Sequence, residues 1–221
     1  FLAYSPERIN TGSTIPLQAI PKVVGGTTEQ CLERAVAVYQ LIFDTVHIVS
    51  STKAAEMTKI LENTQRFINI SFINDFAILC EKMGIDIFEV IEAAATKPYG
   101  FVPYTPGTGI GGHCIPVDPL YLSWKAKEFN HETLFINVAD QINKQMPHYI
   151  TEKIISFLLS RPNKLSSSVL LIGLAYKEDI NDLRESTAVQ IMENLLQKGI
   201  HVEYYDPHVP KVVVHKKTFC S

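Results

Sequence analysis

The stretch VLLIGL (residues 169–174) is an unbroken apolar run, typical of a strand that is covered on both faces in a parallel sheet. A helix from Ser186 or Thr187 to Lys198 is expected next, because a glycine follows directly and glycine is a frequent helix terminator. HVEYY (residues 201–205) then predicts a second strand, closed by an Asp-Pro turn. Strand, loop, helix and strand in this order predict an α/β fold with a parallel sheet.

The beginning of the chain alternates in the same way. Strands are predicted at residues 1–4, 22–26 and 46–49, and a helix capped by Thr27 or Thr28 is expected to run to about Phe43. This alternation predicts the end of another α/β domain.

The middle of the chain is helical instead. Apolar residues recur at helical spacing from Thr52 to Lys82 without a proline or glycine, so one long spine helix is expected, suited to a dimer interface. Shorter helices are predicted over residues 86–96, 120–129 and 133–159, and Pro147 is expected to kink or divide the last of them.

Three parts are therefore expected. They are a partial Rossmann-like N-terminal domain (residues 1–51), a central all-helical domain (52–160) and a partial second Rossmann-like C-terminal domain (169–221), with a linker at residues 160–168. Because the chain opens within a strand and lacks an initiating Met, it is expected to be a fragment of a longer protein.

Composition excludes several classes. A net charge of −3 with 46% hydrophobic residues gives no basic footprint for nucleic acid or an anionic membrane. No apolar run reaches the about 18 residues of a membrane-spanning helix, and no signal peptide is recognisable. The four cysteines have no metal-binding spacing and are expected to be reduced thiols, which favours a cytoplasmic protein without a metal site: Cys31, Cys80, Cys114 and Cys220.

The segment GTGIGGHC (residues 107–114) predicts the chemistry. Four glycines in six residues would let a sugar or nicotinamide lie against the main chain, and Cys114 is a candidate nucleophile with Asp118 four residues later. The formal GxGxxG match is rejected as a dinucleotide motif because no hydrophobic strand precedes it and no βαβ unit surrounds it. A cysteine-protease pair with His113 is also rejected, because adjacent residues of an extended loop point apart.

Other polar residues carry two interpretations each. Lys59 and Asn63 lie four apart on one face of the long helix, either as a solvated stripe or as partners of a developing oxyanion. Glu7 follows a strand end, where open α/β sheets bind ligands, but could be a solvated loop residue. Lys177 and Arg184 flank the loop after VLLIGL, as surface charges or as anion ligands.

These segments, in their order along the chain, resemble the nucleotide-sugar 6-dehydrogenase family, which includes UDP-glucose, GDP-mannose and UDP-N-acetylhexosamine dehydrogenases. The matching segments are YSPERI (4–9), AEMTKILEN (55–63), GIGGHCIPVDP (109–119), GLAYKED (173–179) and DLRES (182–186). KPYGF (97–101) and His113 are most similar to the branch that oxidises UDP-N-acetylglucosamine.

The resemblance implies an NAD-binding domain, a helical domain that forms a homodimer or larger homo-oligomer, and a domain for the UDP-sugar. The family's dinucleotide loop would lie before Phe1, and a later substrate-binding arginine would follow the last residue, so this piece alone is expected to bind NAD poorly. The implied reaction is an NAD-dependent four-electron oxidation of a primary alcohol to an acid, through a thiohemiacetal and a thioester on Cys114.

The resemblance also implies residue roles. Lys59 and Asn63 would stabilise alkoxide and oxyanion stages, Asp118 would position water, and Glu7 would act as acid and base. Residues expected to line the sugar nucleotide are Thr105, Gly107, Gly109, Gly111, Tyr176, Lys177 and Arg8, and those expected to approach NAD are Cys114, Val117, Arg184 and Thr11. Val117 departs from members with lysine there, which puts a side-chain contact to NAD in doubt.

Three alternatives remain open from the sequence. The substrate could be UDP-glucose. A relationship to 3-hydroxyacid dehydrogenases would mean one hydride transfer and no need for a cysteine. The chain could also be an inactive fragment that only binds a nucleotide sugar.

Overall fold

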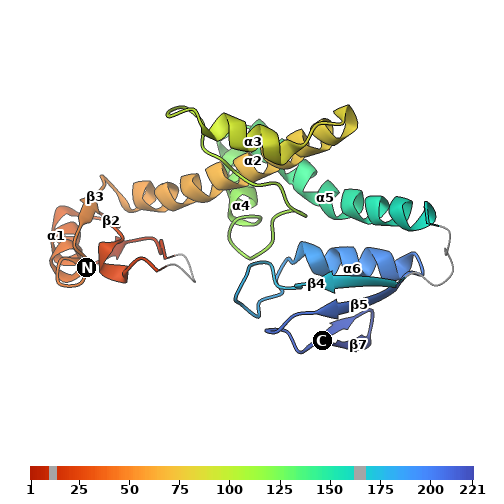
Figure 1. Ribbon diagram of the computed structural model, residues 1–221. Helices are drawn as coiled ribbons and strands as arrows, with labels where there is room; N and C mark the ends of the chain where they lie inside the picture. The colour runs from red at the N-terminus through yellow and green to blue at the C-terminus, as the bar shows by residue number, and fades with distance from the viewer. Residues whose placement is uncertain (10–13, 162–167) are drawn as a thin grey trace. The chain divides into compact units, whose positions relative to one another are not determined.

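The computed structural model describes residues 1–9, 14–161 and 168–221. Two compact units, Phe1–Thr64 and Gln65–Ser221, divide the chain, and the long helix α2 (Thr52–Met83) contributes to both (Figure 1). The predicted linker falls mostly outside the described residues, as does Thr11. The expected domain limits at residues 51 and 160 stay predictions.

The first unit contains a small mixed sheet, short helices and the start of α2. Its elements are β1 (Ala3–Tyr4), η1 (Leu17–Ala19), β2 (Lys22–Gly26), α1 (Glu29–Tyr39) and β3 (Val46–Ile48). β2 and β3 pair in parallel, with Val24 opposite Ile48, and β1 adds to β2 in the antiparallel direction. Parallel pairing around a helix confirms the α/β alternation read from the sequence.

Helix α1 begins as predicted but ends early. The Thr28 hydroxyl accepts from the Cys31 N–H at 3.2 Å, which satisfies an N–H of the first helical turn. The predicted end at about Phe43 is wrong, because the chain turns after Tyr39. The N–H groups of both Ile42 and Phe43 bond to the Tyr39 carbonyl in that turn.

Helices make up the first part of the second unit. After α2 come α3 (Ile87–Ala95), α4 (Asp118–Ala126), η2 (Lys127–Phe129) and α5 (Leu134–Leu159). The single long helix α2 confirms the spine prediction, and Asp86 caps α3 through a bond from the Phe88 N–H at 2.8 Å. Pro147 does not divide α5, which continues through it as one helix.

The C-terminal part has the predicted order of strand, helix and strand. The prediction that VLLIGL is covered on both faces is wrong, because Val169 and Leu171 pack against the core while Leu170 is 56% and Ile172 80% exposed. Strands β4 (Ser168–Ile172) and β5 (His201–Tyr205) pair in parallel, and α6 (Thr187–Gln197) connects them after a cap from Ser186. The sequence analysis did not predict the antiparallel hairpin of β6 (Lys211–Val214) and β7 (Lys217–Cys220). Its turn places His215 and Lys216 at positive φ, without the Asn-Gly or Asp-Gly pair that marks such turns.

Two of the hydrophobic clusters in this unit lie beside the predicted site. One joins α6, β5 and the hairpin, and Ile150 and Ile154 of α5 pack against it. The other surrounds Ile110 of the glycine loop with Phe67, Ile136 and Ala139 from α2 and α5. The loop is thus anchored by a buried side chain between two long helices.

Candidate active site

The glycine loop, residues 105–117, is the last part of the connection from α3 to α4 and contains no helix or strand. Its backbone is held by groups that are distant in sequence. The Gly107 N–H donates to Asn74 Oδ1 at 2.8 Å, the Ile110 N–H to Asn143 Oδ1 at 2.6 Å, and the Gly112 N–H to the Arg184 carbonyl at 2.9 Å. Three different elements therefore set the path of the segment that leads to Cys114.

Three of the loop glycines are needed for packing of chain against chain. Gly112 has a φ of +87°, and a Cβ there would lie 2.9 Å from the Tyr176 ring. A Cβ on Gly111 would meet Tyr176 Cβ at 2.6 Å and the Glu185 carbonyl oxygen at 2.7 Å. A Cβ on Gly109 would meet Thr187 at 2.9 Å. We expected a sugar or nicotinamide in this space, but protein atoms fill it.

Gly107 differs from these three. Apart from Gly107 itself and its two chain neighbours, no atom of the described residues lies within 4 Å of the position that its Cβ would take, so no packing requirement for glycine is visible there. Among the four loop glycines, it is the one whose Cβ side is open to a ligand.

Cys114 lies half-buried where the loop turns into helix α4. Its carbonyl accepts from the N–H groups of Val117 at 3.2 Å and Asp118 at 2.8 Å, and Asp118 is the first residue of α4. This closing turn explains why α4 begins two residues before the predicted start. The predicted nucleophile and the predicted water-positioning carboxylate are thus brought to the same turn.

Arg184 lies on the other side of the loop, where it forms a forked ion pair with Asp182. Three bonds of 2.5–3.0 Å join its guanidinium to the carboxylate, which with a backbone bond lowers the pKa of Asp182 to about 2. The pKa of Arg184 is raised, first by Asp182 and to a smaller extent by the charges of Tyr176 and Cys114. A cation is therefore within electrostatic reach of the predicted nucleophile.

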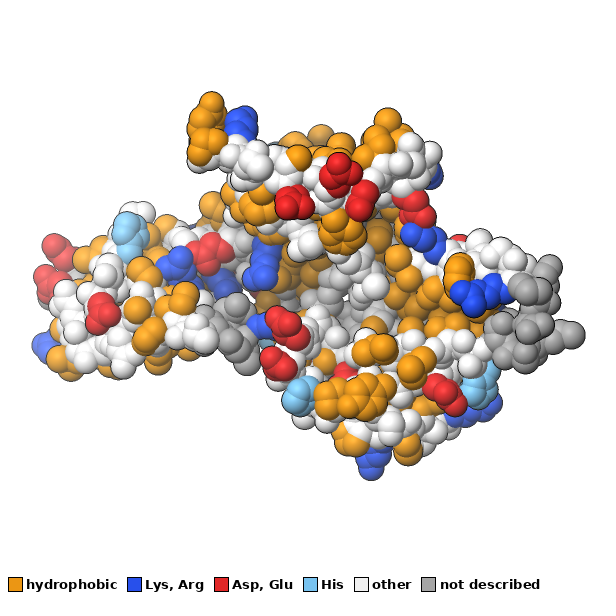
Figure 2. All heavy atoms as spheres, viewed as in Figure 1, with side chains coloured by type: hydrophobic (Ala, Val, Ile, Leu, Met, Phe, Trp, Pro, Cys, Tyr) orange, Lys and Arg blue, Asp and Glu red, His pale blue; other side chains and the backbone are white. Residues whose placement is uncertain are grey.

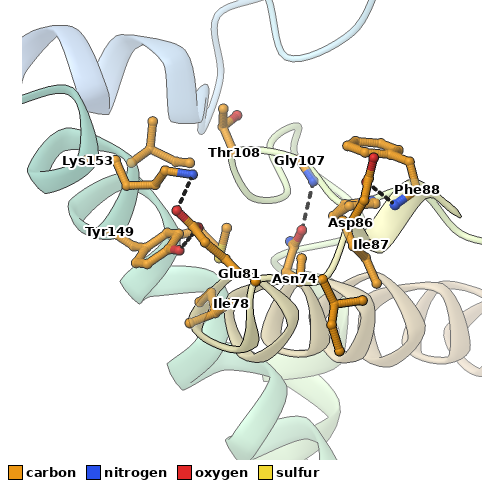
Figure 3. Close-up of a pocket in the computed structure, with 16 residues that line it drawn as sticks. Asn74, Ile78, Glu81, Asp86, Ile87, Phe88, Gly107, Thr108, Tyr149 and Lys153 are labelled. Carbon is orange, nitrogen blue, oxygen red and sulfur yellow. Dashed lines mark hydrogen bonds and ion pairs between the residues drawn. The ribbon is translucent and has the colours of Figure 1, made fainter. Parts of the chain in front are cut away.

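A cavity of about 610 Å³ opens beside the start of the glycine loop (Figure 3). Its lining includes Gly107 and Thr108, the second half of α2, the start of α3 and the middle of α5. Asn74 is 1% exposed, and its Nδ2 finds no hydrogen-bond partner in the described part of the chain. Asn74 Nδ2 is therefore a buried donor beside the loop.

The far end of this cavity holds a polar cluster. Glu81 accepts from the Tyr149 hydroxyl and pairs with Lys153 at 2.8 Å, as the close-up shows (Figure 3). Hydrogen bonds from Lys153 and Tyr149 lower the pKa of Glu81. Burial, followed by the bond to Glu81, raises the pKa of Tyr149 to about 12. The cluster joins α2 to α5 and leaves the cavity end close to neutral.

A second hollow of about 490 Å³ lies at the carboxyl ends of β4 and β5. Lys177 and Thr108 are among the residues that line it. Asp206, at the end of β5, accepts from the N–H groups of Leu174 at 2.8 Å and Ala175 at 3.2 Å and so shapes the loop before Lys177. Ligands of open α/β sheets bind at this edge.

The remaining predicted residues belong to the first unit. Glu7 is exposed, and its Oε1 accepts from the Ile9 N–H at 2.7 Å. Arg8 pairs with Glu62 of α2 at 2.7 Å, which ties this segment to the helix turn that carries Asn63. Asn63 is buried and Lys59 half-buried on the same helix. The structure thus groups Glu7, Arg8, Lys59 and Asn63 in one unit, and Cys114, Asp118 and Arg184 in the other.

Sequence reasoning missed the residues that hold the glycine loop and the loop after β4. Asn74 and Asn143 were read only as members of long helices, and Asp206 only as part of a strand-ending turn. The sequence feature that could have indicated them is a polar residue on the apolar face of a helix, such as Asn74 and Ser71, which are both buried. Within residues 1–9, 14–161 and 168–221, no group of three or more His, Cys, Asp or Glu side chains could hold a metal ion. No helix among those residues is long and apolar enough to cross a membrane.

Comparison with known proteins identifies the family. Residues 53–145 match the central domain of the UDP-glucose/GDP-mannose dehydrogenase family, and residues 170–220 match its UDP binding domain. The chain belongs to this family. The two matched regions contain Lys59, Asn63, the glycine loop with Cys114, and the strand-end hollow with Lys177, which confirms the resemblance found in the sequence.

Individual relatives agree with this assignment. The chain is 40% identical over 212 residues to the UDP-N-acetyl-D-glucosamine 6-dehydrogenase of Pseudomonas aeruginosa, covering 95% of this chain and 50% of that one. It is 35% identical over 199 residues to the UDP-N-acetyl-D-mannosamine dehydrogenase of Campylobacter jejuni, covering 90% and 47%. The chain therefore spans about half the length of the curated relatives it matches.

Solved structures lead to the same family. The UDP-N-acetyl-mannosamine dehydrogenase of Staphylococcus aureus superimposes with a TM-score of 0.77 at 32% identity, over 97% of this chain and 49% of that one. A UDP-glucose dehydrogenase from Pyrobaculum islandicum gives 0.82 at 26% identity, over 93% and 48%. Together with the observed sheets and the long helix, these matches confirm the predicted fold class.

Proposed function

We propose that this chain is part of an NAD-dependent nucleotide-sugar 6-dehydrogenase that oxidises the C6 hydroxymethyl of a UDP-N-acetylhexosamine to a carboxylate. The observation that carries the proposal is Cys114, half-buried at the turn before α4, with Asp118 in the same turn and the Arg184 cation within electrostatic reach. A half-buried cysteine thiol at such a turn can act as a nucleophile.

The chemistry balances with a single thiol. Removal of a hydride and a proton from the alcohol gives an aldehyde, and the Cys114 sulfur adds to it to form a thiohemiacetal. Loss of a second hydride and proton gives a thioester, which water hydrolyses to the acid and the free thiol. Bound NAD would supply the oxidising power by accepting the hydrides, two cofactor molecules per sugar.

The chain's own residues have separate tasks in this proposal. Lys59 and Asn63 stabilise the alkoxide and the later oxyanions as charge develops on the substrate oxygen. Asp118 positions the hydrolytic water, and Glu7 transfers protons in the thioester steps.

Cofactor contacts fall to residues beside the thiol. Arg184 is proposed to bind the phosphates of the cofactor, because its side chain is 59% exposed and a guanidinium can bind phosphate by two hydrogen bonds. Val117 is proposed to approach NAD through its backbone. A role for Thr11 is carried over from the family alone.

Substrate contacts are proposed for both hollows of the second unit. Gly107 lines the 610 Å³ cavity, and Lys177 lines the strand-end hollow, where its ammonium would suit a diphosphate. Thr105, Gly109, Gly111 and Tyr176 would shape the path between them, and Arg8 would act from the first unit. UDP-N-acetylglucosamine is the first candidate, because KPYGF (97–101) and His113 resemble that branch and a 40% identical relative has that name.

We also propose a homodimer formed through α2. Four large apolar side chains of its second half are exposed at spacings of four, three and four residues, and so form one stripe: Phe72, Phe76, Leu79 and Met83. Figure 2 shows exposed apolar side chains over α2 and α3. An apolar stripe of this kind is a typical interface between helices. The proposed setting is the cytoplasm, in biosynthesis of a polysaccharide precursor.

The test uses the full-length protein with UDP-N-acetylglucosamine, UDP-N-acetylmannosamine, UDP-N-acetylgalactosamine and UDP-glucose in parallel. We expect two NADH per sugar with an N-acetylated substrate, and no acid from a Cys114→Ser variant. Cys220→Ser, a change at an exposed thiol of β7, serves as the matched control. One NADH per sugar, or unchanged acid yield from Cys114→Ser, would contradict the mechanism. Faster turnover of UDP-glucose would contradict the substrate.

A further inference from the structure

The side chain of Asn143 holds one residue of the glycine loop by two bonds. Its Oδ1 accepts from the Ile110 N–H at 2.6 Å, and its Nδ2 donates to the Ile110 carbonyl at 3.2 Å. The two bonds resemble those between two directly opposite residues of an antiparallel sheet, except that the side-chain amide of Asn143 replaces the backbone of the second strand. An amide suits the position because it carries a donor and an acceptor in one plane.

Helix α5 has an unusual local structure at this point. Pro147 lies four residues after Asn143 and has no N–H, so the Asn143 carbonyl lacks its ordinary helical donor. Pro147 is fully buried, and its own carbonyl accepts from the Thr151 hydroxyl at 2.7 Å. The adjacent Met146 packs against Gly109, whose Cβ position lies 3.4 Å from Met146 Cβ. The proline and the amide thus occur together where the helix meets the loop.

The loop is enclosed on its other sides as well. Gly109, at a φ of +121°, leaves no room for a side chain between Thr187 and Asn143. The Thr108 hydroxyl lies 2.8 Å from that of Thr187, at the start of α6. Ile110 itself is 7% exposed in the core between α2 and α5. Backbone and side chain of Ile110 are therefore both fixed, four residues before Cys114.

We propose that Asn143 is a positioning residue for the nucleophile. Its two hydrogen bonds fix the backbone of Ile110, and the position of Ile110 determines where the following residues place Cys114. The inference rests on the proposed role of Cys114 and goes beyond it by assigning the geometry of the thiol to an amide on α5. A displacement of about 1 Å at a reacting group can reduce a rate by about 100-fold. Loss of the two Asn143 bonds, four residues before Cys114, can therefore change kcat.

The test is the nearly isosteric Asn143→Asp change. The carboxylate can still accept from the Ile110 N–H, but its second oxygen faces the Ile110 carbonyl and repels it. Asn137→Asp is the matched control, because Asn137 makes the same type of amide contacts on the same helix, with the side chains of Ser123 and Glu132. In the full-length enzyme we expect kcat to fall about 10- to 100-fold in Asn143→Asp. The KM for NAD and the melting temperature should match those of the control.

A second measurement tests the role of Asn143 without requiring enzyme activity. In the 221-residue chain, iodoacetamide labelling resolved by peptide mass spectrometry compares half-buried Cys114 with exposed Cys220 as an internal standard. We expect the ratio of Cys114 to Cys220 labelling rates to rise several-fold in Asn143→Asp and to stay unchanged in Asn137→Asp. An unchanged ratio in a folded Asn143→Asp chain, or a kcat within twofold of the control, overturns the positioning role. If wild-type enzyme oxidises no sugar, the proposed function fails, while the labelling ratio still decides the role of Asn143.

Discussion

The β4–α6–β5 unit and the glycine loop are neighbours in one compact unit but are stabilised in opposite ways. The βαβ unit is held by a parallel ladder and by a hydrophobic core to which its own residues, such as Leu195 and Val202, contribute most of the buried side chains. The loop makes three of its backbone bonds to Asn74, Asn143 and Arg184, which lie 33, 33 and 72 positions away in the sequence. Regular structure thus provides the frame, and the proposed chemistry depends on contacts with other elements.

This difference predicts separate responses to mutation. Damage to the βαβ unit should lower global stability, since its core is shared with the hairpin and α5. Substitutions in the loop should change the position of Cys114 and lower the free energy of unfolding by a smaller amount. The predictions below test whether the two regions can be separated in this way.

The largest effect is expected for Leu195→Ala. Leu195 is fully buried in the C-terminal core, and removal of a buried leucine side chain costs about 2–5 kcal/mol of unfolding free energy. Urea unfolding followed by circular dichroism measures this cost. Leu196→Ala, on the next and only partly buried position of α6, should cost clearly less. Equal losses would mean that the βαβ unit does not unfold around this core.

A smaller effect is expected at Asp206, where the βαβ unit meets the loop that carries Tyr176. Burial raises the pKa of its carboxyl, but the N–H groups of Leu174, His208 and Ala175 outweigh this and hold the pKa below its usual value. Its stabilising contribution is therefore complete above the unfolded pKa of about 3.9 and is lost as pH falls through the lower folded pKa.

Asp206→Asn should cost about 1.5–3 kcal/mol near pH 7, because charged hydrogen bonds become neutral ones. The difference from wild type should shrink as the pH falls below the unfolded pKa of about 3.9 and through the lower folded pKa, where the wild-type carboxyl takes up a proton. Urea unfolding across this range checks both statements. Glu203→Gln, at an exposed position of β5, controls for the loss of a charge. A constant difference at all pH values would exclude Asp206 as the titrating group.

The same contrast explains what could be predicted from the sequence. VLLIGL, the Ser186 cap and the uninterrupted run of α2 are local patterns, and each formed the expected element. The loop could be recognised from its glycines and Cys114. The packing that requires those glycines could not be predicted, because Tyr176 and Thr187 contact them from other parts of the chain. The β6–β7 hairpin was missed because His215 and Lys216 adopt turn conformations that their residue types rarely indicate. Nonlocal contacts have no periodic signature.

The smallest effect, and the sharpest test of the loop, comes from a pair of glycine substitutions. Gly111→Ala places a Cβ 2.6 Å from Tyr176 Cβ and 2.7 Å from the Glu185 carbonyl oxygen, neither of which is the free end of a flexible side chain. Overpacking of this kind costs about 1–3 kcal/mol and should displace the loop from residues 176–187. Gly107→Ala adds the same methyl group where, beyond its chain neighbours, no described residue lies within 4 Å, so unfolding free energy should change little. Thermal unfolding and hydrogen exchange at the Gly112 amide, which donates to the Arg184 carbonyl, distinguish the two variants. If Gly111→Ala leaves both unchanged, the loop does not depend on close packing against Tyr176, and its contrast with the βαβ unit would have to be reconsidered.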